Sequence, residues 1–251
     1  MLIEARDGAT IVLTLNQPAR RNALAMPMRE ALIEALDRIE ADSSVRAVVI
    51  NGAGGHFCAG GDISGMDVTE FGAGRERFRT THRLVKLMLE SSKPFVAAVD
   101  GWAAGAGVGL AICCDTVVAA SDANFLTPFS RIGLIADFAL LHTLPRRIGE
   151  GRARQMFLAG EPIDAATAER WGLVDHVVPP GTTLEKALER AAKLSAGAPL
   201  ATAMTKSILA RGLAETLDWE RNIQSTMFMT GDHAEGKAAF LGKRAPSFKG
   251  A

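Results

Sequence analysis

RAVVINGAGGHFCAGGDI, residues 46–63, is the stretch that decides the fold. Its first part, Arg46–Gly52, is a run of mostly β-branched apolar residues that ends in glycine, which predicts a buried strand of a parallel sheet. Five glycines lie at positions from 52 to 61, and an acid, Asp62, follows the last of them. Glycine serves where the backbone takes unusual angles or approaches another group closely. We therefore expect a strand that ends in a loop whose backbone lies against a ligand.

A second apolar strand ends in the same way. PFVAAV, residues 94–99, leads into DGWAAGAGVGLA, residues 100–111, a glycine-rich turn at the start of a helix. The carboxyl ends of parallel strands open onto the ligand crevice, and helix N-termini present unpaired N–H groups there. Two such turns side by side would aim one N–H each at a single oxygen, which is the arrangement of an oxyanion hole. The alternative is a pair of tight turns that only pack against the sheet; two loops after consecutive strands favour the site.

Length, charge and cysteine count exclude several classes of function. The chain has 251 residues with 28 basic and 28 acidic side chains, so no overall field attracts nucleic acid or an acidic membrane surface. Its start shows no signal-peptide pattern, and no apolar run has the length of a membrane span. The three cysteines have no metal-ligand spacing, and an odd number offers no disulfide framework. We expect a cytoplasmic protein with no metal, no nucleic-acid partner and no membrane partner.

Strands and helices alternate on both sides of this stretch, which predicts the α/β fold class with parallel pairing. Helices are expected from Pro27 and over residues 70–90, and the expected strands cover residues 2–6, 10–15, 45–50, 94–99 and 116–120. Beyond about residue 137 the apolar period is almost wholly helical. The expected organisation is a core over residues 1–190 that carries the site, followed by a helical region over residues 191–251, both within one functional domain.

Six segments in a fixed order resemble the crotonase superfamily, also called the enoyl-CoA hydratase/isomerase family. They are QPARRNALAMPM, AVVINGAGGHFCAGGDISGM, KPFVAAVDGWAAGAGVGLAICCD, RIGLIADFALLHTLPRRIG, LAGEPIDAATAERWGLVDHVVP and AAFLGKRAPSFKG. The resemblance covers nearly the whole chain and implies a spiral of repeated ββα turns with C-terminal helices that trimerise, as a homotrimer or as a homohexamer made of two trimers. It also implies an acyl-CoA thioester as ligand. Coenzyme A then enters as part of the substrate, and no separate cofactor is expected.

The same resemblance assigns the site residue by residue. The backbone N–H groups of Gly61 and Ala106 match the two oxyanion donors, with alanine at position 106 where the family usually has glycine. The resemblance implies that substrate and coenzyme A lie along the following residues: Arg21, Ala23, Leu24, Cys58, Ala59, Gly60, Asp62, Ile63, Phe129, Lys243 and Phe248. Lys243 and Phe248 are expected to act across a subunit interface. Asp62 is also expected to anchor the next turn, as Asp115 anchors backbone at the end of its helix.

The carboxylates of a hydratase are missing from this pattern. Family hydratases use two glutamates to handle water and the α-proton, and the matching positions hold Gly109 and Phe129. Asp137 instead resembles the aspartate of double-bond isomerases in the family. One carboxylate suffices for isomerisation, because it removes a proton from one carbon and returns it to another. An apolar wall such as Phe129 would raise the pKa of this carboxyl by desolvation.

The interpretation we favour is an enoyl-CoA isomerase that uses Asp137 with the Gly61 and Ala106 amides. A bland alternative for Asp137 is that it only caps the helix expected over Phe138–Arg146, since aspartate is a favoured N-cap. Alternatives for the whole protein are hydratase-type or other crotonase chemistry, and a non-catalytic acyl-CoA-binding protein. Hydrolytic dehalogenation ranks lower, because the chain has Trp102 but no tryptophan at position 129. Phe129, Phe138 and Met66 are expected to give the acyl site a bulky apolar lining.

Overall fold

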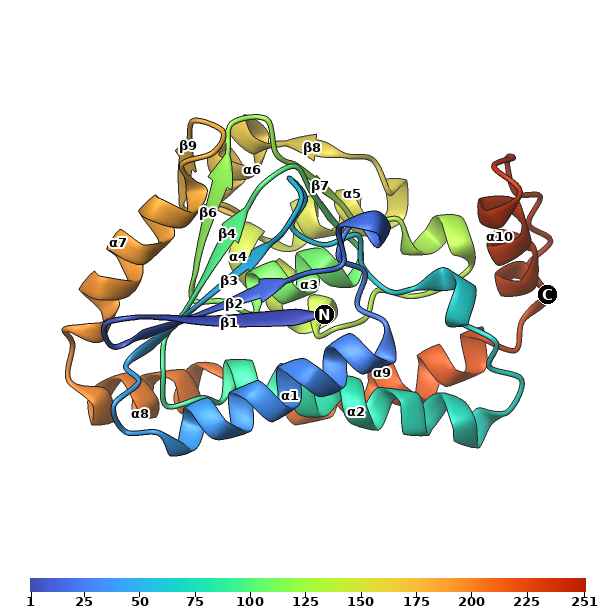
Figure 1. The fold of residues 1–251 in the computed structure, drawn as a ribbon. Helices are drawn as coiled ribbons and strands as arrows, with labels where there is room; N and C mark the ends of the chain where they lie inside the picture. Colours follow the sequence, from blue (N-terminus) through green and yellow to red (C-terminus); the bar gives the residue numbers. More distant parts are fainter.

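The main sheet of the computed structural model has six strands in the order β1-β2-β3-β4-β6-β9 (Figure 1). The strands are β1 Leu2–Asp7, β2 Thr10–Leu15, β3 Ala47–Gly52, β4 Phe95–Val99, β6 Thr116–Ala120 and β9 His176–Val178. β1 pairs antiparallel with β2, and every later pairing in this sheet is parallel. The strands expected from the sequence are thus confirmed to within two residues at their ends.

A second, three-stranded sheet has the order β5-β7-β8. Its strands are β5 Trp102–Ala104, β7 Asn124–Leu126 and β8 Ile163–Asp164. β5 and β7 each follow a strand of the main sheet after a short turn, and they pair in parallel with one another. The pattern of two strands and a helix therefore repeats along the chain, as the α/β crotonase spiral predicts. Strands of two or three residues are too short to show a period in the sequence.

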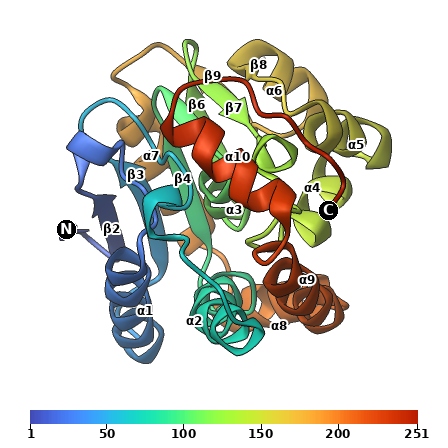
Figure 2. The same ribbon diagram turned by 90° about the vertical axis from the view of Figure 1, so that its right-hand side faces the viewer.

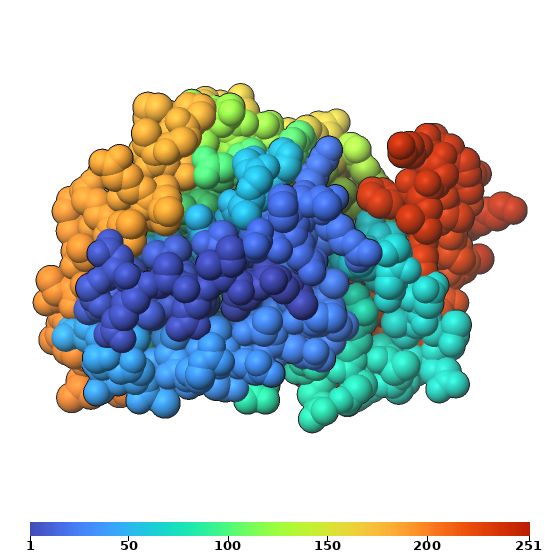
Figure 3. All heavy atoms as spheres, in the orientation of Figure 1, coloured from blue at the N-terminus to red at the C-terminus, as the bar shows by residue number.

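Ten helices surround these sheets. They are α1 Met26–Ala41, α2 Phe71–Leu89, α3 Ala106–Ile112, α4 Leu140–Ile148, α5 Glu150–Ala159, α6 Ala165–Trp171, α7 Thr183–Ser195, α8 Pro199–Leu209, α9 Leu213–Met227 and α10 Gly231–Leu241. α1, α2, α8 and α9 form a layer along one side of the sheet (Figures 1 and 2). α10 and the C-terminal tail form a lobe that protrudes from the body (Figure 3). No helix combines the length and the apolar character needed to cross a bilayer.

The central strands are buried on both faces, which explains their continuous apolar sequence. In β3, Val48 and Ile50 belong to the large core that includes α1, α2 and α3. Ala47 and Val49 point to the other face, where they pack with α7. α7 presents Ala187 and Ala191, one helical turn apart, to the sheet. Position 190, where the helical region was expected to begin, lies inside α7.

Asp115 anchors backbone as expected. Its carboxylate accepts a hydrogen bond of 2.8 Å from the Phe95 N–H at the start of β4, and Lys206 Nζ of α8 lies 2.6 Å from the same oxygen. The aspartate therefore joins the end of α3 to the neighbouring strand and to the C-terminal helices.

Candidate active site

The two glycine-rich loops run side by side. The Cys58 N–H donates to the Trp102 carbonyl at 3.0 Å, and the Ala104 N–H donates back to the Cys58 carbonyl at 2.9 Å. A β-carbon on Gly60 would lie 3.3 Å from the Ala106 nitrogen, and Gly60 has a φ of +88°. Glycine is required here because a side chain would be strained and would press on the second loop. The loop after β3 is thus seated directly against the start of α3.

The Gly61 N–H is free of any partner within the chain. The Gly60 carbonyl accepts a hydrogen bond from the Leu24 N–H at 2.7 Å. In a trans peptide the carbonyl and the next N–H point in opposite directions, and the chain has no cis peptide bond. The bond from Leu24 therefore turns the Gly61 N–H away from the 21–24 segment.

The Ala106 N–H is free for a different reason. Ala106 is the first residue of α3, and the Gly105 carbonyl accepts from the Val108 N–H at 3.0 Å and the Gly109 N–H at 3.3 Å. The first N–H groups of a helix have no partner within it. The Ala106 N–H accordingly points out of the helix end, where the dipole favours negative charge. Both amides expected as oxyanion donors are thus unpaired, and their role stays a prediction.

The segment expected to carry coenzyme A is fixed to the glycine loop. The Ala59 N–H donates to the Arg21 carbonyl at 2.9 Å, while Leu24 binds Gly60 as described. Between them, Asn22 is fully buried with a φ of 57°. Its Oδ1 accepts from the Gln17 N–H at 2.9 Å, and its Nδ2 donates to the carbonyls of Ala53 and His56 at 2.8 and 2.7 Å. Asn22 had not been identified from the sequence, because its partners lie far along the chain.

Arg29 of α1 joins the glycine loop to Asp137. Its side chain is only 2 % exposed, and its Nε donates to the Leu24 carbonyl at 2.9 Å. Its Nη1 donates to the Thr81 hydroxyl of α2. Its Nη2 lies 3.7 Å from the place of a β-carbon on Gly61. Burial lowers the pKa of Arg29 to about 10, and the charge of Asp137 counteracts this. The guanidinium therefore stays charged beside both parts of the site.

Asp137 is a buried acid without a hydrogen-bond partner on Oδ1. The residue is 8 % exposed and precedes α4. Burial raises the pKa of its carboxyl to about 7, and the negative charge of Glu220 adds to the rise. The positive charges of Arg29 and Arg77 and a hydrogen bond from the Gln224 side chain oppose it. A carboxyl with a pKa near neutrality exchanges protons readily in both directions, as a general base and acid must.

The helix-capping interpretation of Asp137 is wrong. α4 begins at Leu140 rather than at Phe138, and no side chain caps it. The N–H groups of Phe138 and Ala139 are instead bound by the two oxygens of Glu220, each at 3.0 Å. Glu220 comes from α9, so this partner could not be inferred from the local sequence.

Aromatic side chains lie at or beside the two positions, Gly109 and Phe129, that the resemblance matches to the hydratase glutamates. Phe138 is fully buried against Gly109, and a β-carbon on Gly109 would lie 2.8 Å from the β-carbon of Phe138. Phe129 lies beside the second loop, with Cζ 3.7 Å from the place of a β-carbon on Gly105. Met66 Cε lies 2.7 Å from the equivalent place on Gly61. Phe129 and Met66 therefore adjoin the amides, whereas Phe138 closes the space next to Gly109.

The remaining predicted site residues are distributed as follows. Burial raises the pKa of the Cys58 thiol to about 12, which makes it a packing residue. Asp62 accepts from the Ser64 N–H at 3.1 Å and so caps the turn that begins at Ile63, as expected. Ala23 is buried beside Leu24. Lys243 and Phe248 are exposed after α10, and no hydrogen bond joins them to the glycine loop within one chain.

Comparisons with known proteins show the family of this chain. A family model described as enoyl-CoA hydratase/isomerase matches residues 5–251. The chain is 37 % identical over 253 residues to 2,3-dehydroadipyl-CoA hydratase of Escherichia coli K12, covering 99 % of this chain and 98 % of that one. It is 36 % identical over 254 residues to 1,2-epoxyphenylacetyl-CoA isomerase of the same organism, covering 97 % and 96 %.

Solved structures with a similar fold belong to the same family. The crystal structure of an enoyl-CoA hydratase from Mycobacterium avium subsp. paratuberculosis K-10 superposes with a TM-score of 0.87 at 31 % identity, covering 99 % of this chain and 98 % of the other. The chain belongs to the enoyl-CoA hydratase/isomerase family, and its fold is that of the crotonases.

Replacing Asn22 should destabilise the protein. The variant Asn22→Ala leaves the Gln17 N–H and two partly buried carbonyls without partners, which is expected to lower the free energy of unfolding by about 2–4 kcal/mol. Urea denaturation measures the change. The partly exposed Asn16 gives the control, since Asn16→Ala should remain within about 0.5 kcal/mol of the wild type. Equal stabilities of the two variants would contradict the prediction.

Replacing Gly109 tests the closed space beside Phe138. Gly109→Ala should lower the free energy of unfolding by about 1–3 kcal/mol, because its methyl group would overlap the Phe138 side chain. Gly72→Ala in α2 is the matched control: a β-carbon there meets nothing within 4 Å, so it should be neutral or slightly stabilising. Chemical denaturation of both variants compares the signs, and a neutral Gly109→Ala would show that the space is open.

The stability of the protein should report the raised pKa of Asp137. At pH values between 3.8, the ordinary pKa of aspartate, and about 7, the folded protein holds a proton on Asp137 that the unfolded chain has lost. The free energy of unfolding therefore falls as pH rises through this range. Asp137→Asn should therefore be more stable than the wild type by about 2–4 kcal/mol at about pH 8, and the gain should shrink toward about pH 5. Denaturation series at both pH values, with exposed Asp122→Asn as control, make the measurement. A pH-independent difference would show that the carboxyl is not perturbed.

Proposed function

We propose that this member of the enoyl-CoA hydratase/isomerase family moves a double bond within the acyl chain of an enoyl-CoA thioester. Asp137 removes a proton from one carbon next to the conjugated system. The negative charge spreads onto the thioester oxygen, where the Gly61 and Ala106 N–H groups stabilise it. Asp137 then returns the proton to a different carbon, so the product is an isomer and no atom is gained or lost. Coenzyme A is part of the substrate, and this reaction needs no further cofactor.

The single observation that supports this proposal most is the state of Asp137. Its Oδ1 is buried without a partner, and the pKa of its carboxyl is raised to about 7. Gln224 is the one hydrogen-bonding side chain that acts on this carboxyl, whereas a purely structural carboxylate would have donors on both oxygens, because an unpaired buried charge is costly. A base that must also act as an acid works best with a pKa near the working pH. Asp137 matches the second description.

The two free amides supply the complementary part of the reaction. A thioester α-proton is only weakly acidic, so its removal requires stabilisation of the enolate oxygen. Loss of one well-placed donor typically costs about 2.7–4 kcal/mol of transition-state stabilisation. Donors on the backbone at Gly61 and Ala106 are fixed by the fold and need no reorganisation during the reaction.

Coenzyme A is proposed to lie along the loop over residues 21–24 and the loop over residues 58–63, with Lys243 and Phe248 supplied by a neighbouring subunit of a trimer or hexamer. The exposed apolar face of α8 supports an assembly, since Leu200, Met204 and Ile208 are 79 %, 60 % and 59 % exposed. A reducing, cytoplasmic location is also proposed, and the three free cysteines support it.

Hydration is the second candidate function, because a relative 37 % identical to this chain is a hydratase by name. It would require a second group to position and deprotonate water. The positions that the resemblance assigns to such groups hold Gly109 and Phe129, and Phe138 fills the space beside Gly109. These side chains favour isomerisation over hydration.

Solvent exchange tests Asp137 as the base. In deuterated water the wild type should exchange deuterium into an enoyl-CoA thioester, with a rate that rises with pH through about 7 because the carboxylate is the active form. Asp137→Asn should slow exchange by about 10²–10⁴-fold. Asp122→Asn, an exposed aspartate, should leave the rate unchanged. Exchange that survives in Asp137→Asn would disprove the proposed role.

Labelled water separates isomerisation from hydration. The same enzyme, incubated with aliphatic and aromatic enoyl-CoA thioesters in ¹⁸O water, should give isomers without label in the acyl chain. Incorporated label detected by mass spectrometry would favour hydration. Tight binding of the thioesters with neither exchange nor label would identify a non-catalytic acyl-CoA-binding protein.

A further inference from the structure

Asp137 lies in a segment that α9 holds from both sides. On one side, Gln224 accepts from the Ile135 N–H at 3.0 Å and donates to the Ile135 carbonyl at 2.8 Å. On the other, Glu220 accepts from the N–H groups of Phe138 and Ala139, each at 3.0 Å. Glu220 and Gln224 are both 0 % exposed and stand one helical turn apart. Two buried polar side chains of one helix therefore bind the backbone on both sides of Asp137.

The backbone that Glu220 binds has an unusual conformation. Phe138 and Ala139 both have a φ of +58°, in the left-handed region that residues with a β-carbon rarely adopt. Such residues persist only where the surroundings hold them. A carboxylate that accepts from two successive N–H groups supplies that restraint, because charged hydrogen bonds are stronger than neutral ones.

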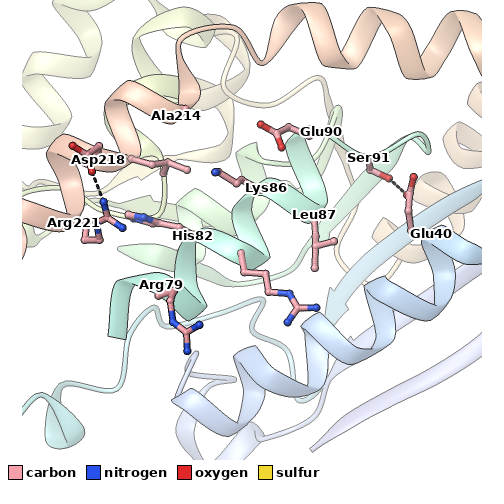
Figure 4. A pocket seen from close by; sticks show the side chains of 12 residues that line it. Glu40, Arg79, His82, Lys86, Leu87, Glu90, Ser91, Ala214, Asp218 and Arg221 are labelled. Carbon is pink, nitrogen blue, oxygen red and sulfur yellow. Dashed lines mark hydrogen bonds and ion pairs between the residues drawn. The ribbon is translucent and has the colours of Figure 1, made fainter. Parts of the chain in front are cut away.

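Glu220 is itself held by His82 of α2. His82 Nε2 lies 2.9 Å from Glu220 Oε1. His82 also lies on the wall of a cavity of about 520 Å³ between α2 and α9, which Figure 4 shows beside Arg221 and Lys86. A fully buried glutamate is costly unless it is paired and hydrogen-bonded. Glu220 has three such bonds, and two of them end on the residues that follow Asp137.

We propose that Glu220 is a positioning residue for Asp137: by binding the N–H groups of Phe138 and Ala139 it holds the segment that carries the Asp137 carboxyl in its active orientation. This inference rests on the proposed function of Asp137. It assigns Glu220 no contact with the substrate. The next helix begins three residues after the base and has no side-chain cap from its own segment, so the distant helix α9 supplies the restraint.

The charge of Glu220 has a second effect on the same carboxyl. The charged groups that face Asp137 are Glu220 of α9, Arg29 of α1 and Arg77 of α2, and His82 of α2 faces Glu220. Glu220 raises the pKa of Asp137, whereas the two arginines lower it. Neutralising Glu220 should therefore lower the pKa of Asp137 from about 7. A substitution that keeps the negative charge and only shortens the side chain should not lower it.

Three variants separate these effects. Glu220→Gln keeps the shape and one acceptor oxygen but removes the charge, and its NH2 group cannot accept from the second N–H. Glu220→Asp keeps the charge but shortens the side chain by one methylene, so that it no longer reaches both N–H groups. Glu215→Gln neutralises an exposed glutamate on the same helix and serves as the control.

The first measurement is the solvent-exchange rate against pH. Glu220→Gln should shift the acid limb of the profile to lower pH, whereas Glu220→Asp should leave the limb in place and lower kcat by about 10²-fold with little change in KM. Glu215→Gln should match the wild type in both respects. Profiles of Glu220→Gln and Glu220→Asp that coincide with that of Glu215→Gln would overturn the inference.

The second measurement needs no turnover. The ¹³C resonance of the Asp137 carboxyl, assigned by its loss in Asp137→Asn, is titrated in the full chain without substrate. A lower titration midpoint in Glu220→Gln supports the inference, and an unchanged midpoint overturns it. A lowered midpoint in a protein whose Asp137→Asn variant still exchanges deuterium would refute the proposed function while the link between Glu220 and Asp137 stands.

Discussion

The hydrogen bond from the Leu24 N–H to the Gly60 carbonyl is the contact on which the site depends. It fixes the plane of the peptide that joins Gly60 to Gly61, and so turns the Gly61 N–H away from the 21–24 segment. Because Gly60 has a φ of +88° and lies against the second loop, only glycine allows this peptide to sit there. Leu24 in turn is held by the Arg29 side chain and by the turn around Asn22. The orientation of the Gly61 N–H is thus set by α1, the glycine loop and α3 together.

The acid of the site is governed by a balance of buried charges. Burial and Glu220 favour the neutral carboxyl of Asp137, whereas Arg29 and Arg77 favour the carboxylate. Without Glu220, burial would still raise the pKa of the Asp137 carboxyl, but by less. Without the arginines, the pKa of this carboxyl would be higher than it is. The opposing charges keep both protonation states accessible to one residue.

The sequence predicted the parts of this arrangement that are local. The apolar runs of β3, β4 and β6, the two glycine loops and the acid at position 137 are visible as patterns of a few neighbouring residues. Glu220 could not be found in this way, because it binds Phe138 from 82 residues along the chain and resembles any other helical glutamate. The same holds for Asn22, which binds Ala53 and His56, and for the buried Arg29. The start of α4 was misplaced for the same reason, since its preceding turn is shaped by α9.

The cradle of backbone amides is common to every reaction that passes through a thioester enolate, so it does not decide between isomerisation and hydration. The choice between isomerisation and hydration depends on the side chains next to the amides. In this chain a phenylalanine fills the space beside Gly109, and another lies beside Gly105, which leaves Asp137 as the carboxyl with a free oxygen. An apolar surface disfavours a bound water, which needs several polar partners. In the proposed reaction, a single proton carrier next to an apolar surface would direct reprotonation of the enolate to carbon, which is movement of a double bond.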